Sequence, residues 1–517
     1  MTDIHPQSKH VCELLVIGGG INGVGIARDA AGRGLSVILC EKDDLASHTS
    51  SASSKLIHGG LRYLEYYEFA LVRKALLERE DILRMAPHLV QPLRFIMPYL
   101  PGLRPRWMLR LALFLYDHLA PRQLLPGSRS LNLLKDSSKG VLRPDIRQAF
   151  EYSDAWVDDA RLVVLNAVDA AERGATIWTR TCCEHLAQVN GRWHARLRRV
   201  HASGRTELIE VDAALVVNAC GAWASQLQAL YDPHPQAKHL RLVKGSHIVV
   251  KRLFAHQRAY IFQHHDGRIV FALPYEGEFT LIGTTDLDFQ GDLNQPHISA
   301  AEVDYLCELA SDYFDRPLHA ADVCWSFSGV RPLIDEAGHD AKAVSRDYVL
   351  EMAQTQAPML HVFGGKITTY RRLAEDAMQM LMPVLNATAG NWTRHACLPG
   401  GDLFCDRPDN QNVVRFPEFI AMCQHSYPFL DAAIVARMAR AYGQRIHRLL
   451  AGISDHHDLG APIVPGLYKC EIDYLRDTEF AQTAEDILWR RSKLGLHMSD
   501  DQQEQVRSWL QQNAAEI

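Results

Sequence analysis

The sequence lacks three features that would mark a membrane-spanning, metal-binding or secreted protein. No apolar run reaches the about 18 residues that a transmembrane helix needs. The 11 cysteines show no metal-ligand spacing. The first ten residues contain no apolar segment of the kind found in signal peptides. We therefore predict a cytoplasmic protein with reduced thiols and no metal site.

The chain also has little excess charge of either sign. Its 55 Lys and Arg residues against 61 Asp and Glu residues give a net charge of −6, which offers no overall attraction to nucleic acid. With 47% hydrophobic and 22% charged residues, the composition is that of an ordinary globular protein. A chain of 517 residues is too long for a single hydrophobic core, so we expect two or three domains.

A dinucleotide-binding fingerprint is present near the N-terminus. An apolar run leads into Gly18, Gly20 and Gly23, which stand in the G-x-G-x-x-G spacing, and a second apolar run ends in Glu41. The three glycines suit a tight turn, a close approach to pyrophosphate and the packing of a helix on a strand, in that order. The helix N-terminus would face the phosphates. We expect Glu41 to accept hydrogen bonds from the adenosine ribose.

A segment rich in hydroxyl side chains follows the fingerprint. Residues 49–63 read TSSASSKLIHGGLRY, where a nicotinamide-dependent enzyme would normally continue to alternate helices and strands. Small hydroxyls and backbone N–H groups suit a second length of cofactor, with its pyrophosphate and ribityl chain. The segment therefore favours a flavin dinucleotide.

This segment resembles the FAD-dependent, quinone-linked glycerol-3-phosphate dehydrogenases of the D-amino-acid-oxidase-like flavoprotein superfamily. Further blocks match this family in order along the chain: EYSD at 151–154, WVDDARL at 156–162, KGSH at 244–247, IGTTD at 282–286, SGVRPL at 328–333 and FGGKITTYR at 363–371. The resemblance implies oxidation of sn-glycerol 3-phosphate to dihydroxyacetone phosphate by hydride transfer to non-covalently bound FAD. It also implies that the electrons pass to a membrane quinone.

The expected fold is α/β, with a Rossmann-like FAD-binding domain, an antiparallel-sheet substrate domain and a helical C-terminal domain. Residues 11–394 would form the oxidoreductase region, with FAD-binding parts at about 11–90, 150–240 and 325–390. The substrate-binding part would span about 241–324, with 91–149 as a further candidate, because strands at 268–273 and 278–283 flank a Glu-Gly turn. Residues 395–517 follow a Pro-Gly-Gly linker and have helical patterns. Dimerisation and capping of the substrate site are both open as roles for this region.

Cofactor contacts are expected from the glycine turn, the hydroxyl-rich segment and two later glycine-containing turns. Gly221 follows an apolar strand that would run beneath the cofactor, and the helix after Gly365 would stabilise negative charge on the reduced flavin. The predicted cofactor-binding residues are Gly18, Gly20, Ile21, Asn22, Gly23, Glu41, Lys42, Thr49, Ser50, Ser53, Ser54, Leu56, Gly221, Gly365, Lys366, Ile367 and Thr368.

A phosphorylated substrate needs clustered cations, preferably arginines. The resemblance assigns substrate contact to Arg62, Tyr63, His247, Thr284, Arg331, Arg346 and Lys366. Two histidines, His58 and His247, are candidates for the base that takes the C2 hydroxyl proton, because histidine titrates near neutrality. Arg331 and Lys366 would also lower the pKa of the hydroxyl electrostatically, so a mechanism without a single strong base is open as well.

A basic segment with aromatic residues spans 103–119. Arg104, Arg106 and Arg110 alternate with apolar residues that include Trp107 and Phe114. Such a helix could lie on an anionic membrane or pack on the protein core. Because a quinone is lipid-soluble, we expect peripheral association with the inner face of the cytoplasmic membrane through this helix.

Other functions remain open at this point. An oxygen-reducing oxidase of glycerol 3-phosphate would share these motifs, and an amino-acid oxidase would need one carboxylate-binding arginine rather than several cations. A flavin-binding regulator without turnover is a third possibility. The identity of the quinone and a homodimeric state are also open.

Overall fold

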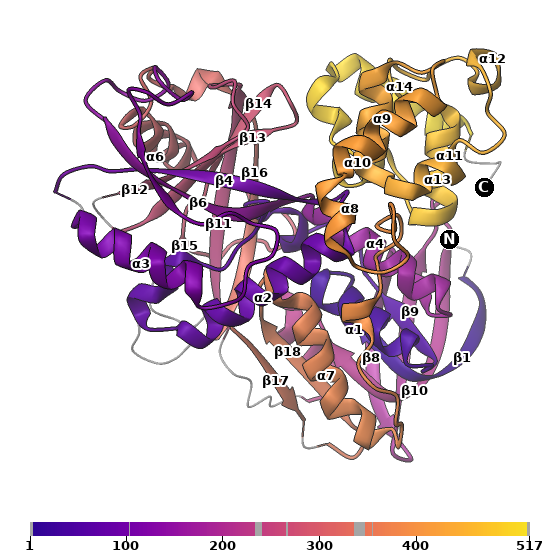
Figure 1. Cartoon of the computed structure of the whole chain (residues 1–517). Helices are drawn as coiled ribbons and strands as arrows, with labels where there is room; N and C mark the ends of the chain where they lie inside the picture. Colours follow the sequence, from indigo (N-terminus) through magenta and orange to yellow (C-terminus); the bar gives the residue numbers. More distant parts are fainter. Residues whose placement is uncertain are drawn as a thin grey trace.

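Two β-sheets and a helical C-terminal lobe make up the chain in a computed structural model (Figure 1). The structure describes residues 4–102, 104–232, 240–264, 267–334, 347–353 and 355–513. No helix within these residues is long and apolar enough to cross a membrane.

The first sheet has the parallel order expected of a dinucleotide-binding fold. Its strands run in the order β17-β18-β10-β1-β2-β7, with β9 added to β10 and β8 to β9. The strands are β1 (Ile4–Ile17), β2 (Val37–Cys40), β7 (Thr176–Trp178), β8 (Thr181–Val189), β9 (Arg192–Val200), β10 (Thr206–Asn218), β17 (Tyr348–Met352) and β18 (Met359–Gly364). All pairs from β18 to β7 are parallel.

Three helices cover one face of this sheet. They are α1 (Ile21–Gly32), α4 (Asp159–Glu172) and α7 (Tyr370–Val384). Leu14 and Val16 of β1 point into the core with these helices, whereas Leu15 and Ile17 point into a second core shared with β8 and β9. The end of β1 is apolar at every position because alternate side chains of a strand are buried on opposite faces.

The second sheet is largely antiparallel. Its order is β15-β11-β14-β13-β12-β4-β6-β3, with β16 beside β11 and β5 beside β6. The strands are β3 (Leu56–Ile57), β4 (Val90–Pro98), β5 (Arg129–Asn132), β6 (Gln148–Val157), β11 (Leu240–Lys251), β12 (Ala259–Gln263), β13 (Ile269–Tyr275), β14 (Phe279–Gly283), β15 (Leu287–Asp288) and β16 (Val323–Ile334). The predicted hairpin is confirmed as β13–β14. Because Tyr275 pairs with Phe279, the connection has three residues, of which Glu276 and Gly277 have positive φ.

The second sheet draws on more of the chain than the segment predicted to bind substrate. β3, β4, β5 and β6 lie outside residues 241–324, and β16 runs past the end of that range. Of these strands, β5 and most of β4 fall within the further candidate segment, 91–149. Helices α2 (Phe69–Met85), α3 (Arg106–His118) and α6 (Ala300–Ser311) accompany this sheet, and α5 (Ala224–Gln228) follows β10. Strands from both ends of the oxidoreductase region therefore meet in one sheet.

The C-terminal lobe is helical, as predicted, and has its own hydrophobic core. It contains α8 (Asn410–Val414), α9 (Phe416–Ser426), α10 (Ala432–Tyr442), α11 (Ile446–Leu449), α12 (His456–Leu459), α13 (Lys469–Glu479), a π-helix η8 (Asp486–Arg491) and α14 (Asp500–Gln512). The lobe lies beside α4, and α3 lies at the edge of the molecule away from it (Figure 1).

Candidate active site

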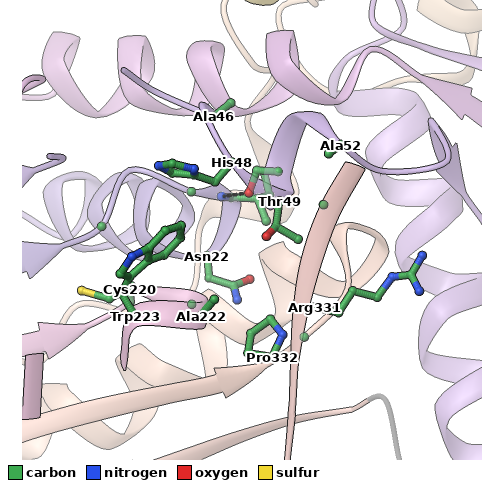
Figure 2. Close-up of a pocket in the computed structure, with 18 of the residues that line it drawn as sticks. Asn22, Ala46, His48, Thr49, Ala52, Cys220, Ala222, Trp223, Arg331 and Pro332 are labelled. Carbon is green, nitrogen blue, oxygen red and sulfur yellow. Dashed lines mark hydrogen bonds between the residues drawn. The ribbon is translucent and has the colours of Figure 1, made fainter. Parts of the chain in front are cut away.

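A cavity of about 510 Å³ is lined by residues from both sheets. Gly18, Glu41, Gly221 and Gly365 line it, each just beyond the carboxyl end of a parallel strand. This edge is where open α/β sheets bind their ligands. Among the labelled side chains of Figure 2, Trp223 and Arg331 lie on opposite sides of the view. Because Trp223 and Arg331 both line the cavity, it extends from one to the other, and we call the part around Arg331 its cationic end.

The glycine turn has the geometry that the fingerprint predicts. Gly18 has φ +116°, and a Cβ there would lie 2.5 Å from the carbonyl oxygen of Ala219. A Cβ at Gly23 would lie 1.9 Å from the carbonyl oxygen of Gly18, so only glycine allows α1 to approach the turn. Gly20 lines the cavity, and the N–H of Ile21 donates to Ser50 Oγ at 3.0 Å.

Glu41 is held rigidly at the cavity wall. Its Oε2 accepts the N–H of Gly19 at 2.6 Å, and its Oε1 accepts the N–H of Asp43 at 2.9 Å. Burial raises the pKa of Glu41, and these two backbone bonds oppose that shift. Each carboxylate oxygen can accept a second hydrogen bond, which leaves acceptor capacity for ribose hydroxyls.

The structure brings most of the predicted cofactor-binding residues to this one cavity. Lining it are Gly18, Gly20, Ile21, Asn22, Glu41, Lys42, Thr49, Ser50, Ser53, Ser54, Leu56, Gly221, Gly365, Lys366 and Ile367. The two others lie behind the lining: Gly23 packs against the glycine turn, and Thr368 is buried, with its Oγ1 accepting the N–H of His58 at 3.2 Å.

The lining fits a flavin dinucleotide. Asn22 donates its Nδ2 hydrogen to the carbonyl of Gly364 at 3.1 Å, while its Oδ1 is buried and has no hydrogen-bond partner within the described part of the chain. A buried acceptor of this kind needs a donor. Together with the glycine turn, the acid at position 41 and the hydroxyls at 49–54, it forms a site for a long polar cofactor.

Five of the predicted substrate or catalytic residues line the same cavity. They are His58, Tyr63, Thr284, Arg331 and Lys366. The Arg331 guanidinium pairs with Asp286 and donates from Nη2 to Thr284 Oγ1 at 3.2 Å. Lys366 Nζ lies 3.6 Å from the centre of the Tyr63 ring. Two cations, Arg331 and Lys366, therefore line the cavity, and each is held by neighbouring side chains.

Three of the predicted substrate or catalytic residues are not among those that line the cavity. His247 is 1% exposed and lies behind Ser54, with Nε2 2.9 Å from Ser54 Oγ and its ring stacked on Phe327. Burial, with Arg331 and Lys55 nearby, lowers the pKa of His247 well below its usual value. Arg62 instead donates to the Tyr66 hydroxyl at 3.4 Å. Arg346 lies outside the described residues.

The structure also adds lining residues that sequence reasoning did not assign. Trp223 stands two residues after Gly221, with Lys42 Nζ 4.3 Å from its ring centre and the His48 ring 4.5 Å away. Phe271 of β13 also lines the cavity. The aromatic residue directly after the NACGA run was a usable signal for Trp223, whereas the alternation of β13 gives no sign that Phe271 faces a ligand.

Comparison with known proteins identifies the family. Residues 13–371 match the model of FAD dependent oxidoreductases, and residues 391–516 match that of the C-terminal domain of alpha-glycerophosphate oxidase. A glycerol-3-phosphate dehydrogenase of Pseudomonas aeruginosa is 50% identical over 518 aligned residues, covering 99% of this chain and 98% of the relative. The chain belongs to the FAD-dependent glycerol-3-phosphate dehydrogenase family.

Two further relatives add detail on the family. A D-erythritol 1-phosphate dehydrogenase of Brucella abortus is 46% identical, covering 96% of this chain and 97% of the relative. The glycerol-3-phosphate dehydrogenase of Bacillus halodurans, solved in complex with FAD, has a TM-score of 0.76 at 28% identity, covering 97% of this chain and 90% of that one. Family membership confirms FAD as the cofactor predicted from the sequence.

Proposed function

We propose that this protein oxidises sn-glycerol 3-phosphate to dihydroxyacetone phosphate and passes the electrons to a membrane quinone. The observation that carries the proposal is that two cations, Arg331 and Lys366, line the cavity that we assign to FAD. Two cations suit a dianionic phosphate better than the single carboxylate of an amino acid. The family relatives named above act on phosphorylated polyols, which agrees with this choice.

Arg331 is the residue that we assign to the phosphate. Its pairing with Asp286 and its bond to Thr284 Oγ1 hold the guanidinium in one orientation before substrate arrives. Pre-ordering of this kind reduces the side-chain entropy lost on binding. Lys366, held over the Tyr63 ring, would supply the second positive charge.

His58 is the residue that we assign to removal of the C2 hydroxyl proton. It lines the cavity, and its backbone is fixed by the bond from its N–H to Thr368 Oγ1, whereas His247 is separated from the cavity by Ser54. When bound, FAD supplies the acceptor for the hydride that leaves C2. His247 would then act indirectly, by orienting the Ser54 hydroxyl.

Anaerobic reduction of the flavin tests the substrate assignment. Glycerol 3-phosphate should bleach the flavin absorbance, and unphosphorylated glycerol should not do so at the same concentration. Failure of glycerol 3-phosphate to bleach would contradict the proposal, and bleaching by D-erythritol 1-phosphate alone would point to the longer polyol phosphate. Oxygen uptake without added quinone would favour the oxidase alternative.

We also propose a membrane-facing surface made by α3 and the 3₁₀ helix η2 (Leu61–Tyr66) with the residues that follow it. Exposed aromatic residues gather there, with 70% of Trp107, 53% of Phe114 and 80% of Tyr67 accessible to solvent. Arg106 and Arg110 of α3 are exposed beside them. An apolar surface flanked by arginines suits an anionic bilayer, where a quinone resides.

Arg104 differs from the other two arginines of this segment. It precedes α3, pairs with Glu65 and donates from Nη1 to Gln263 at 2.7 Å. Its charge is therefore largely neutralised within the protein. Replacing Arg106 and Arg110 together by Gln should weaken binding to anionic liposomes by about 2 kcal/mol at low salt. Arg104→Gln, which removes one equal charge from the same segment, should weaken it less. If the loss of liposome binding per removed charge were the same for Arg104→Gln as for the Arg106 and Arg110 variant, or if neither variant lost binding, the membrane-facing surface would lie elsewhere.

A further inference from the structure

The turn after Glu41 is held from behind by the C-terminal lobe. Arg491 of the π-helix η8 donates from Nη1 and Nη2 to the two carboxylate oxygens of Asp44, at 2.5 and 2.8 Å. Arg490 adds a bond from Nε to Asp44 Oδ2 at 2.6 Å. The Arg491 and Asp44 side chains are 0% and 1% exposed, although they are 447 positions apart in the chain. A buried two-point bond of this kind fixes both distance and orientation.

Asp44 is the first residue of a turn that touches the glycine-rich loop. The N–H of Ser47 donates to the carbonyl of Asp44 at 3.2 Å, and the N–H of Ala46 donates to the carbonyl of Gly19 at 3.3 Å. Ala46 and Ser47 line the cofactor cavity. The N–H of Gly19 is in turn bound by Glu41. A shift of Asp44 would therefore reach both the glycine turn and the cavity wall.

A second connection runs beside the first. Both carboxylate oxygens of Asp486, also in η8, accept from Arg180 Nη2 at 2.8 Å. The N–H of Arg180 donates to the carbonyl of Asp43 at 2.7 Å. Burial opposes ionisation of Asp486, but Arg491, Arg180 and Arg490 together lower its pKa below the usual range. Asp486 thus stays ionised and links the C-terminal lobe to the residue before Asp44.

The shape of η8 explains why this short segment can make both connections. A π-helix is wider than an α-helix and occurs mostly as single turns, often at functional sites. Here the one turn places Arg490 and Arg491 together on Asp44, while Asp486 faces Arg180. Arg491 also donates from Nε and Nη2 to the carbonyl of Glu479 at 3.0 and 2.6 Å, so its guanidinium is held on both sides.

We propose that Arg491, assisted by Arg490, is a positioning residue for FAD, and that the C-terminal lobe serves to hold the Asp44–Ser47 turn against the glycine-rich loop. Neither arginine touches the cationic end of the cavity, where Arg331 lies. The proposal concerns affinity for the cofactor and does not depend on which polyol phosphate is oxidised.

The test measures FAD binding to the full-length apoprotein by the quenching of flavin fluorescence. Asp44→Asn and Arg491→Gln should each raise the Kd for FAD at least tenfold. Arg491→Lys keeps the positive charge but loses the two-point bond, so its Kd for FAD should lie between those of Arg491→Gln and the wild type. The double variant should bind FAD no more weakly than Asp44→Asn alone, because Asp44→Asn already removes the bond that Arg491→Gln removes.

The matched control is Arg445→Gln. This change breaks the ion pair between Arg445 and Glu172, whose atoms are 2.5 Å apart. The pair joins the C-terminal lobe to α4, and neither residue lines the cavity. It should alter the Kd for FAD by less than twofold while changing the apoprotein's urea midpoint. An unchanged Kd in Arg491→Gln, or an equal rise in the control, would overturn the proposal. If Asp44→Asn and Arg491→Gln do not fold, the partly exposed Arg490→Gln decides: a Kd raised about threefold supports the proposal and an unchanged Kd refutes it.

Discussion

A methyl group at position 245 would lie beside the Arg331 guanidinium, which we assign to the substrate phosphate. Gly245 lies in β11 opposite Gly329 of β16, and its φ is outside the left-handed region, so alanine can adopt its backbone conformation. The added Cβ would lie 2.5 Å from Arg331 Nη2 and 2.7 Å from Thr284 Oγ1. Both atoms are at the ends of side chains that can rotate, so we expect the sheet to stay intact and the guanidinium to move.

The size of that movement sets the expected loss. Ordinary contact begins near 3.4 Å, so the Arg331 guanidinium must retreat by about 1 Å. A misplacement of this size costs up to about 100-fold in rate. Complete loss of a charge-assisted bond to a buried anion costs on the order of 2–5 kcal/mol, which is the effect expected for Arg331→Ala. We therefore expect Gly245→Ala to lower kcat/KM for glycerol 3-phosphate by about 10- to 100-fold.

Steady-state assays with glycerol 3-phosphate and a soluble dye acceptor measure this effect. The flavin spectrum and FAD content should remain those of the wild type, because Gly245 does not line the cofactor cavity. Gly390→Ala is the control, since a Cβ at that position meets no atom within 4 Å. If Gly245→Ala kept kcat/KM within twofold of the wild type while Arg331→Ala lost activity, the position of the guanidinium would not matter and the reasoning would be refuted.

Three further predictions concern the cofactor and stability. Gly20→Val should give colourless protein, because its side chain would fill the space for pyrophosphate beside Ser50; a normal absorbance at 450 nm would contradict this. Acid precipitation of the wild type should release all flavin colour to the supernatant, and colour retained in the pellet would indicate covalent attachment. Burial, with Arg161 nearby, lowers the pKa of His88 to about 3, so the unfolded chain binds the extra proton between about pH 6.5 and 3. Because of His88, the free energy of unfolding should therefore fall by about 1.4 kcal/mol for each pH unit below 6.5. The urea midpoint of His88→Leu should fall less steeply with pH over that range.

Local chemistry made much of the cofactor site predictable. The conformation of Gly18 and the closeness of Gly23 to the turn depend on neighbouring residues, so a short motif contains the information. The same holds for Glu41, which comes directly after a buried strand.

Contacts between distant segments could not be read in this way. His247 belongs to a matching block, but the pairing of β11 with β16 puts it opposite Phe327 and behind Ser54. In the sequence, Arg104 cannot be told apart from Arg106 and Arg110, but in the fold it pairs with Glu65. The register of strands and the packing of helices decide such contacts, and neither is encoded in the spacing of nearby residues.

The second sheet is built from strands that lie far apart in the chain, and this determines when the cofactor site can form during synthesis. Residues that line the cavity run from Ile17 to Ile367, so no part of the chain released early contains a complete site. At about 5–20 residues per second, roughly 20–70 s separate the two ends of this lining during translation. During that interval the first parallel strands and the glycine turn exist without β16 and β18. We therefore expect newly made chains to bind FAD only late in synthesis. The supply of flavin should then affect the yield of FAD-loaded protein more than the early folding of the N-terminal unit does.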